Sequence, residues 1–181
     1  MADQRVEIVD YDSGWPGRFA EQQPLVADLL SPWLTSPVEH VGSTAVPGLR
    51  AKPVIDMLAL VGSLAQAQTA VPALADAGWL FWPDDPCRLY RLWFLRPRPE
   101  ARTHHLHVIE NGHPHAMALL KFRDALRADA RLRDEYADLK GQLALQHPDN
   151  RNAYSNAKGR FVVQTLRRAG IEPPPRDLLP E

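Results

Sequence analysis

The amino-acid sequence predicts a mixed α/β protein, in which a small sheet with packed helices is followed by a helical C-terminal portion. Residues 1–120 alternate strand-like and helical patterns, whereas residues 121–170 show apolar residues at helical spacing and no strand-like run. The chain has 181 residues, of which 45% are hydrophobic, enough for one ordinary core. We therefore expect a sheet-and-helix core at 1–120, a helical segment at 121–170 packed on the same domain, and a flexible, Pro-rich tail at 171–181.

The first part of the core is predicted to contain three strands and two helices. The strands are expected at 6–10, 38–41 and 53–61, and the helices at 15–34 and 63–77. Ser13 is a candidate cap for the first helix, and Pro24 can kink or divide it. Gly78 is expected to end the second helix.

Three further strand-like segments then follow without helices between them, at 79–82, 89–95 and 104–110. Strands joined by short connections pair antiparallel, whereas parallel neighbours need a crossover. One earlier crossover followed by antiparallel neighbours predicts a mixed sheet.

The helical segment is expected to contain two helices. Apolar residues at helical spacing extend over 122–143 and stop before His147, and a second series extends over 154–166. Gly170 is a plausible end for the second helix.

Composition and charge exclude several classes of protein. The formal net charge is −1, which does not favour wrapping of nucleic acid or binding to anionic membranes, and no nucleic-acid-binding motif is recognised. Cys87 is the only cysteine, which excludes an internal disulfide and a cysteine-based zinc cluster. The N-terminal residues lack the features of a secretion signal, and the longest apolar stretch, 53–61, is too short to span a membrane. We expect a cytoplasmic protein without a membrane partner.

Asp56 is the most unusual residue of the predicted strands. It lies in an otherwise apolar run at 53–61, which is typical of a central strand covered on both faces. Because an unpaired buried charge is costly, this carboxylate needs a cation, strong hydrogen-bond donors or a metal. A structural ion pair and a metal ligand are both compatible with the pattern.

A Gly-Ser turn precedes this strand. Gly42, Ser43 and Thr44 follow the strand at 38–41, where backbone N–H groups and a hydroxyl can face a phosphate oxygen. Most Gly-Ser pairs are only turns. Because twelve residues separate Ser43 from Asp56, the turn can lie beside the carboxylate and combine an anion site with a metal ligand.

His105 and His107 are further candidate metal ligands. Residues two apart on a strand point to the same face, so the two imidazoles can bind one metal with Asp56 if the faces coincide. The alternative is that these histidines bond to backbone or solvent on an exposed face.

Several cations are candidates for binding phosphate, because guanidinium and ammonium groups pair with phosphate oxygens. Lys52 directly precedes the strand that carries Asp56. Arg91 and Arg96 are five residues apart, so they cannot share one face of a strand, and we select Arg96. A solvated surface is the alternative for each of these side chains.

Four segments resemble the GrpB family: EHVGSTAVPGLRAKPVIDMLALV (39–61), HHLHVIENG (104–112), KFRDALRADARLRDEYADLK (121–140) and NAYSNAKGRFV (152–162). The family is similar to the polymerase-beta-like nucleotidyltransferases, which implies a small mixed sheet with packed helices and C-terminal helices. Members also occur fused to dephospho-coenzyme A kinase as an accessory domain, which implies a coenzyme A biosynthetic enzyme as a partner. Arg123 and Lys158 lie in family-like segments and become candidates for contacting phosphate.

The resemblance also implies a set of metal-binding carboxylates. In nucleotidyltransferases the Gly-Ser turn is followed by two carboxylates one residue apart on the next strand, with a third on a later strand. Gly42, Ser43 and Asp56 match this pattern, but Leu58 occupies the second carboxylate position. The acidic residues that we considered as substitutes are Glu39, Asp84, Asp85 and Glu110.

The leading hypothesis is a protein that binds a nucleoside triphosphate, or another phosphate-bearing small molecule, with Mg²⁺ or Mn²⁺ and transfers a nucleotidyl group to an acceptor. Asp56 and Ser43 are the expected catalytic residues, and the expected metal ligands are Asp56, His105 and His107. The expected phosphate-binding residues are Gly42, Ser43, Thr44, Lys52, Arg96, Arg123 and Lys158. The alternatives are a non-catalytic module that binds a ligand or a protein, and a single-metal Asp/His hydrolase.

Overall fold

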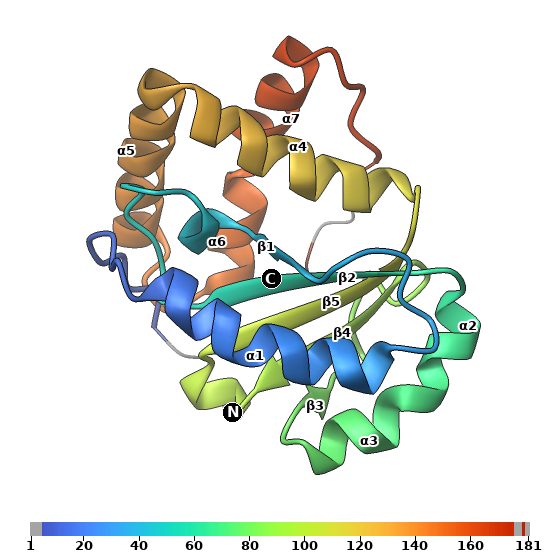
Figure 1. The fold of residues 1–181 in the computed structure, drawn as a ribbon. Helices are drawn as coiled ribbons and strands as arrows, with labels where there is room; N and C mark the ends of the chain where they lie inside the picture. The colour runs from blue at the N-terminus through green and yellow to red at the C-terminus, as the bar shows by residue number, and fades with distance from the viewer. Residues whose placement is uncertain (1–4, 176–178, 180–181) are drawn as a thin grey trace.

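The computed structural model describes residues 5–175 and 179, and within them the chain forms a five-stranded sheet (Figure 1). The strands are β1 (Glu39–Val41), β2 (Ile55–Val61), β3 (Leu80–Phe81), β4 (Arg91–Arg96) and β5 (His104–Glu110). Their order is β1-β2-β5-β4-β3; β2 and β5 are parallel, and the other neighbours are antiparallel. The predicted mixed sheet, with antiparallel pairing among the later strands, is confirmed.

The helices lie on both sides of this sheet. They are α1 (Trp15–Leu30), α2 (Leu64–Ala67), α3 (Val71–Asp76), α4 (Pro114–Ala128), α5 (Ala130–Gln146), α6 (Arg151–Ala157) and α7 (Gly159–Arg168). Helices α1 to α3 cover one face, and the C-terminal helices α4 to α7 lie on the other side (Figure 1). Among the described residues, no helix is long and apolar enough to cross a membrane.

The strand predicted at 6–10 is not present, and this prediction was wrong. Val9 forms a single isolated bridge with Ala51, whereas the N–H of Val6 donates to the carbonyl oxygen of Pro148. The segment therefore divides its backbone hydrogen bonds between two distant parts of the chain, which prevents a continuous ladder.

Helix α1 is shorter than predicted and has a different cap. It continues through Pro24 and ends at Leu30, two residues before Pro32, which has no N–H to extend the ladder. Gly14, not Ser13, occupies the cap position, and its N–H donates to Oδ1 of Asp12.

The predicted helix at 63–77 consists of α2, a 3-10 turn (Gln68–Ala70) and α3. Its start and end are as predicted: Oγ of Ser63 accepts the N–H of Gln66, and Gly78 has a φ of 85°.

The single helix predicted over 122–143 is two helices. Asp129 ends α4, and its side chain accepts the N–H of Leu132 as the cap of α5. Phe122 and Tyr136 meet across the two helices with ring centroids 5.2 Å apart, so one apolar series continues over both. Helix α4 already begins at Pro114, before the expected start of the helical segment at residue 121. The second predicted helix is also divided, into α6 and α7.

The described part of the C-terminal tail, 171–175 and 179, packs against the helices. The carbonyl oxygen of Pro175 lies 3.1 Å from Nε2 of His115, and the side chain of Asn156 exchanges two hydrogen bonds with the backbone of Leu179. These contacts hold a segment that we expected to be flexible; the expectation for 176–178 and 180–181 lies outside the described residues.

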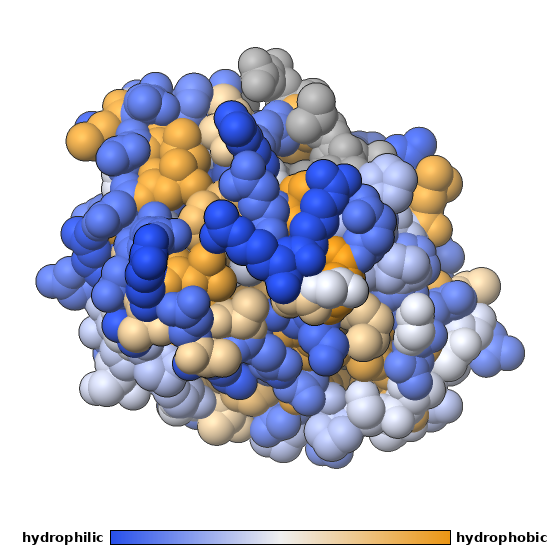
Figure 2. Space-filling view, turned by 90° about the horizontal axis from the view of Figure 1, so that it is seen from above, coloured by the Kyte–Doolittle hydropathy of each residue, from blue (hydrophilic) through white to orange (hydrophobic). Residues whose placement is uncertain are grey.

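The two faces of the sheet are covered differently. The face toward α1 contributes to a large hydrophobic cluster that includes Trp15, Met57 and Leu106, whereas the opposite face contributes to a small one around Leu58 and Ile109. Figure 2 views the molecule from the side of the C-terminal helices and shows separate hydrophobic patches interrupted by hydrophilic residues. The polar residues of β2 and β5 lie beside the small cluster.

Candidate functional site

Parallel pairing of β2 and β5 brings three predicted site residues together. Asp56 is the Cα partner of His105, and His107 lies two residues further along β5 on the same face. Oδ1 of Asp56 lies 3.0 Å from Nδ1 of His105 and 3.6 Å from Nε2 of His107. The ligand atoms of the three residues all lie within 4.8 Å of one another. We refer to Asp56, His105 and His107 as the Asp-His-His cluster.

The Gly-Ser turn lies directly beside this cluster. Gly42 follows β1 with a φ of 70° and a ψ of −168°, a conformation that is open to glycine and strained for other residues. A Cβ atom on Gly42 would overlap Oδ2 of Asp56. Glycine is therefore required here both for the turn and for the close approach of the Asp56 carboxylate.

A cavity of about 370 Å³ is lined by the turn, through Gly42 and Ser43, and by Asp56 of the cluster. Its charged and hydroxyl-bearing lining residues include Ser43, Asp56, Arg91 and Lys158. About 28% of the Asp56 side chain is exposed, so a ligand in this cavity can reach the carboxylate. The turn, the carboxylate and one predicted cation thus share a single site.

The electrostatics of the cluster favour one anionic carboxylate between two neutral imidazoles. Burial alone raises the pKa of Asp56, but the interactions with His105 and His107 outweigh it and hold this pKa well below its usual range. Burial lowers the pKa of His105 to about 4 in spite of the neighbouring carboxylate, and it also lowers the pKa of His107. These are the protonation states that metal ligands must have.

Arg91 contacts the far side of His107. Its Nε and Nη2 atoms donate to both carboxylate oxygens of Asp85 at 2.8 and 2.7 Å, and Nη1 lies 3.1 Å from Nδ1 of His107. A guanidinium group can only donate, so Nδ1 accepts this hydrogen bond. The neutral His107 ring therefore carries its proton on Nε2, the nitrogen that faces Asp56.

The cluster fits a single divalent cation in ligand type and spacing. Asp56 supplies an anionic oxygen, and Nε2 of His105 is buried and has no hydrogen-bond partner within the described part of the chain. His107 can bind a cation through Nε2 only if its proton moves to Nδ1, where Nη1 of Arg91 must then turn away. Nδ1 of His105 donates to the anionic Asp56, so the unpartnered Nε2 is the nitrogen of His105 that is free to bind a cation, whereas His107 requires the adjustment.

A group of cations lies beside the Asp-His-His cluster. Burial, followed by repulsion from Lys158 and Arg151, lowers the pKa of Lys52 well below its usual value, and Asp56 opposes this shift. The Nζ atoms of Lys52 and Lys158 lie 5.0 and 4.3 Å from the ring centroid of Tyr154. The predicted cations Lys52 and Lys158 are therefore close to the carboxylate, where an anionic ligand would relieve their mutual repulsion.

Arg96 lies on the other face of the sheet, contrary to the prediction. It is the Cα partner of His104 rather than of a cluster residue, and its Nη1 donates to Oε1 of Gln22 at 2.5 Å. Arg91, which we did not select, lines the cavity instead. The spacing correctly excluded a shared face for the two arginines, but only the register of β4 against β5 decides which of them faces the cluster.

Thr44 and Arg123, two of the predicted phosphate-binding residues, make hydrogen bonds within the protein. The buried hydroxyl of Thr44 donates to the carbonyl oxygen of Val54 at 3.1 Å and lies 3.0 Å from Nε2 of His40. The buried guanidinium of Arg123 donates to Glu39 at 2.7 Å and to the carbonyl oxygen of His40 at 3.0 Å, which joins α4 to β1.

No acidic residue in the described part of the chain joins Asp56 as a second carboxylate ligand. Glu39 binds Arg123, Asp85 binds Arg91, and Glu110 accepts the N–H of Leu64 at 2.8 Å. Asp84 is exposed and does not belong to the cluster. The described residues therefore provide ligands for one metal rather than two.

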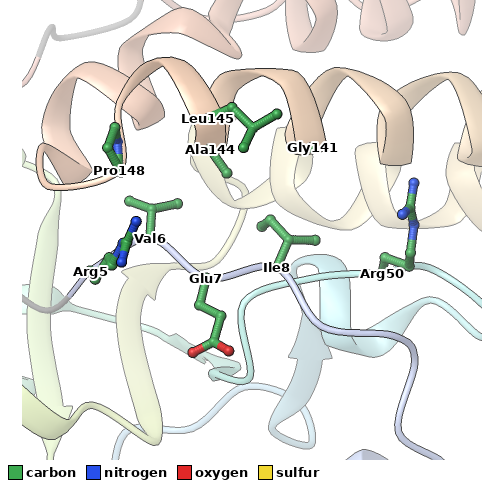
Figure 3. Close-up of a pocket in the computed structure, with 9 residues that line it drawn as sticks. All are labelled: Arg5, Val6, Glu7, Ile8, Arg50, Gly141, Ala144, Leu145 and Pro148. Carbon is green, nitrogen blue, oxygen red and sulfur yellow. The ribbon is translucent and has the colours of Figure 1, made fainter.

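A larger cavity of about 630 Å³ lies between the N-terminal segment and α5 (Figure 3). Arg5, Val6, Glu7 and Ile8 line one side, and Arg50 reaches it from a different loop. None of the predicted site residues lines this cavity, so we assign the candidate site to the smaller one.

Comparison with known proteins agrees with this fold. A family model described as GrpB protein matches residues 5–168. The chain belongs to the GrpB family. It is 41% identical over 176 residues to a UPF0157 protein of Pseudomonas aeruginosa, covering 92% of this chain and 69% of that protein. The crystal structure of the conserved protein GrpB from Enterococcus faecalis superimposes with a TM-score of 0.81 at 29% identity, covering 90% of this chain and 96% of that one.

GrpB-family sequence also occurs inside longer relatives. The chain is 31% identical over 189 residues to a dephospho-CoA kinase of Mycolicibacterium paratuberculosis, covering 91% of this chain and 46% of that protein. The mixed five-stranded sheet with packed helices, as described over 5–175, is the GrpB fold and is consistent with a nucleotidyltransferase-like fold.

Proposed function

We propose that this GrpB-family protein binds a phosphate-bearing small molecule, such as a nucleoside triphosphate, together with one divalent cation. The observation that carries the proposal is the Asp-His-His cluster, whose ligand atoms lie within 4.8 Å of one another and whose Asp56 lines a cavity together with Lys158. A carboxylate and imidazoles bind the cation, and the neighbouring ammonium groups offset the charge of the phosphate.

Each residue has a defined task in this proposal. Asp56 and His105 hold the cation, and His107 joins them when Nη1 of Arg91 turns toward the phosphate. Ser43 lines the cavity and offers its hydroxyl to a phosphate oxygen. Binding of an anion also favours the charged form of Lys52, because it offsets the repulsion from Lys158.

A cation held by Asp56, His105 and His107 would supply positive charge to a phosphate group and would stabilise negative charge on a leaving group. Two imidazoles among three ligands favour Mn²⁺ or Zn²⁺ over Mg²⁺, which prefers oxygen ligands. We therefore expect Mn²⁺ to support tighter binding than Mg²⁺.

Two reactions are compatible with such a site. Transfer of a nucleotidyl group to an acceptor is the reaction that the resemblance to nucleotidyltransferases implies. Hydrolysis of the phosphate ligand is the second candidate, and a specific observation favours it: among the described residues the cluster contains one carboxylate, which suits one metal rather than two.

Calorimetric titration tests the proposal. Wild type, Asp56→Asn and the control Asp84→Asn, which removes an exposed carboxylate outside the cluster, are titrated with ATP and with pyrophosphate in the presence and absence of Mn²⁺ or Mg²⁺. We expect metal-dependent binding in wild type and the control, and a loss of at least about 100-fold in Asp56→Asn, since even outer partners of metal ligands are worth about 10–100-fold. Release of pyrophosphate or of phosphate then distinguishes transfer from hydrolysis.

Unchanged affinity in Asp56→Asn would show that the cluster is not the site. If no phosphate ligand binds with any metal, the nucleotide and metal proposals both fail. The remaining hypothesis is then the accessory module, which acts through a partner protein such as a coenzyme A biosynthetic enzyme.

A further inference from the structure

The cavity at the Asp-His-His cluster has one charged side and one apolar side. The apolar side is formed by α4, α7 and the tail, and its residues include Leu119, Phe122, Val162, Val163, Leu166 and Pro173. Asp56, Arg91 and Lys158 line the same cavity from β2, from β4 and from the residue that precedes α7. A ligand that fills it therefore meets charge at one end and mostly carbon at the other, and Tyr90, His115 and Tyr136 also line the cavity.

This distribution disfavours a polar nucleoside in the apolar part. The base and sugar of a nucleoside carry several hydrogen-bond donors and acceptors, and burying them without partners is costly. Val162, Val163 and Leu166 of α7 offer no side-chain partner for such groups. They instead favour an alkyl chain or an unsubstituted ring, whose transfer from water to this wall is favourable.

Described residues of the tail border the apolar part. Pro173, Pro174 and Leu179 line the cavity, and the hydrogen bonds between Asn156 and Leu179, at 2.9 and 3.0 Å, hold Leu179 in place. With a volume of about 370 Å³, the cavity lies near the lower end of the range for small-molecule sites, roughly 300–1,000 Å³. It suits a phosphate joined to one small apolar group.

We infer that the ligand class of this site is a phosphate ester of an apolar alcohol or phenol. Its phosphate lies at the cluster with the cation, and its alkyl or aryl group packs against α4 and α7. This inference rests on the proposed function, because it requires phosphate binding at the cluster.

A series of simple phosphate esters tests the inference. Wild-type protein with Mn²⁺ is titrated with inorganic phosphate, methyl phosphate, hexyl phosphate, phenyl phosphate and AMP. We expect hexyl and phenyl phosphate to bind at least about tenfold more tightly than methyl phosphate, as burial of several carbons predicts. AMP is expected to bind no more tightly than methyl phosphate. Equal affinity for methyl and hexyl phosphate, or tighter binding of AMP than of both apolar esters, would overturn the inference.

The double variant Val162→Thr/Val163→Thr tests whether the tighter binding of hexyl phosphate depends on contacts with α7. Threonine has the shape of valine but carries a hydroxyl in place of one methyl group, so it makes the wall more polar with little change in volume. We expect the advantage of hexyl phosphate to fall to about threefold or less, with methyl phosphate affinity unchanged. The matched control is Val71→Thr on α3, a half-buried valine on the other face of the sheet, which should keep the full advantage.

The outcomes separate the two proposals. Metal-dependent binding of methyl phosphate without a gain for the apolar esters overturns only the inference about the ligand class. Loss of all binding in Val162→Thr/Val163→Thr, with wild-type circular dichroism, also contradicts it, since the apolar wall would then be needed for the phosphate itself. If neither inorganic phosphate nor any ester binds to wild type, the proposed function and the inference are both wrong.

Discussion

Along β5, Leu106 and Val108 pack into the large hydrophobic cluster under α1, whereas His105 and His107 face Asp56 on the other side of the sheet, where Asp56 lines the cavity. The same alternation occurs in β2, where Met57 faces α1 and Asp56 faces the cavity. The face toward α1 is covered by apolar side chains, and the other face combines the small hydrophobic cluster around Leu58 and Ile109 with charged groups. Because successive strand residues point to opposite faces of the sheet, β2 and β5 each contribute both to the hydrophobic core and to the candidate site.

The difference between the faces indicates where stability and ligand binding reside. Burial of apolar surface is the main stabilising contribution to folding, so the α1 face should carry much of the free energy of unfolding. The cavity face instead holds polar groups whose hydrogen bonds contribute little net stability but provide ligand contacts. Substitutions on the α1 face should therefore lower the free energy of unfolding and leave ligand affinity unchanged. Substitutions on the cavity face should weaken ligand binding and change the free energy of unfolding little.

The largest expected effect compares neighbours on β5. Leu106 is fully buried, so Leu106→Ala should lower the free energy of unfolding by about 2–5 kcal/mol and leave Mn²⁺ affinity of the folded protein unchanged. His105→Gln should cost less than about 1.5 kcal/mol but weaken Mn²⁺ binding at least about tenfold. Urea unfolding and calorimetric titration measure the two quantities. Equal destabilisation by both substitutions would contradict the separation of the faces.

A second comparison uses glycines on the two sides. Gly42→Ala should lower stability by about 1–3 kcal/mol and abolish Mn²⁺ binding, because the conformation is strained and the new methyl group displaces the Asp56 carboxylate. Gly17 in α1 is the matched control, since a Cβ there meets no atom within 4 Å. Gly17→Ala should raise stability by about 0.5–1 kcal/mol and leave binding unchanged. A Gly42→Ala protein with wild-type stability and Mn²⁺ affinity would refute this account of the turn.

The smallest effect concerns a cation buried on the side of the C-terminal helices. Nζ of Lys140 donates to the carbonyl oxygen of Arg50, and burial, with repulsion from Lys158 and Arg50, lowers the pKa of Lys140 to about 6. The unfolded chain keeps the ordinary value near 10.5, so it binds more protons between pH 6 and 10.5. Wild-type stability should therefore rise with pH across this window.

Lys140→Met removes this dependence. At pH 7 we expect the variant to be more stable by about 1 kcal/mol, because folding of the wild type requires Lys140 to lose its proton, and replacing buried ionic groups by apolar ones is often neutral or stabilising by about 1–4 kcal/mol. The advantage should shrink toward pH 10. Urea unfolding at pH 6, 8 and 10 measures it, and parallel pH profiles for the two proteins would show that Lys140 keeps an ordinary pKa.

The sequence by itself determined the features that depend on neighbours along the chain. The two-residue spacing of His105 and His107 predicts a shared face, and the isolated charge of Asp56 in an apolar strand predicts a polar partner. Gly42 marks a turn that other residues cannot adopt without strain. These predictions agree with the structure because strand alternation and backbone sterics act over only a few residues.

Only the tertiary structure decided which distant groups meet. The register of β4 against β5 places Arg91 at the cavity and Arg96 on the opposite face, and a shift of one residue would have exchanged them. Asp129 divides the C-terminal helical segment because α5 folds back on α4, which no local pattern requires. Register and packing partners depend on contacts between segments far apart in sequence, and these contacts exist only once the sheet and its helices have assembled.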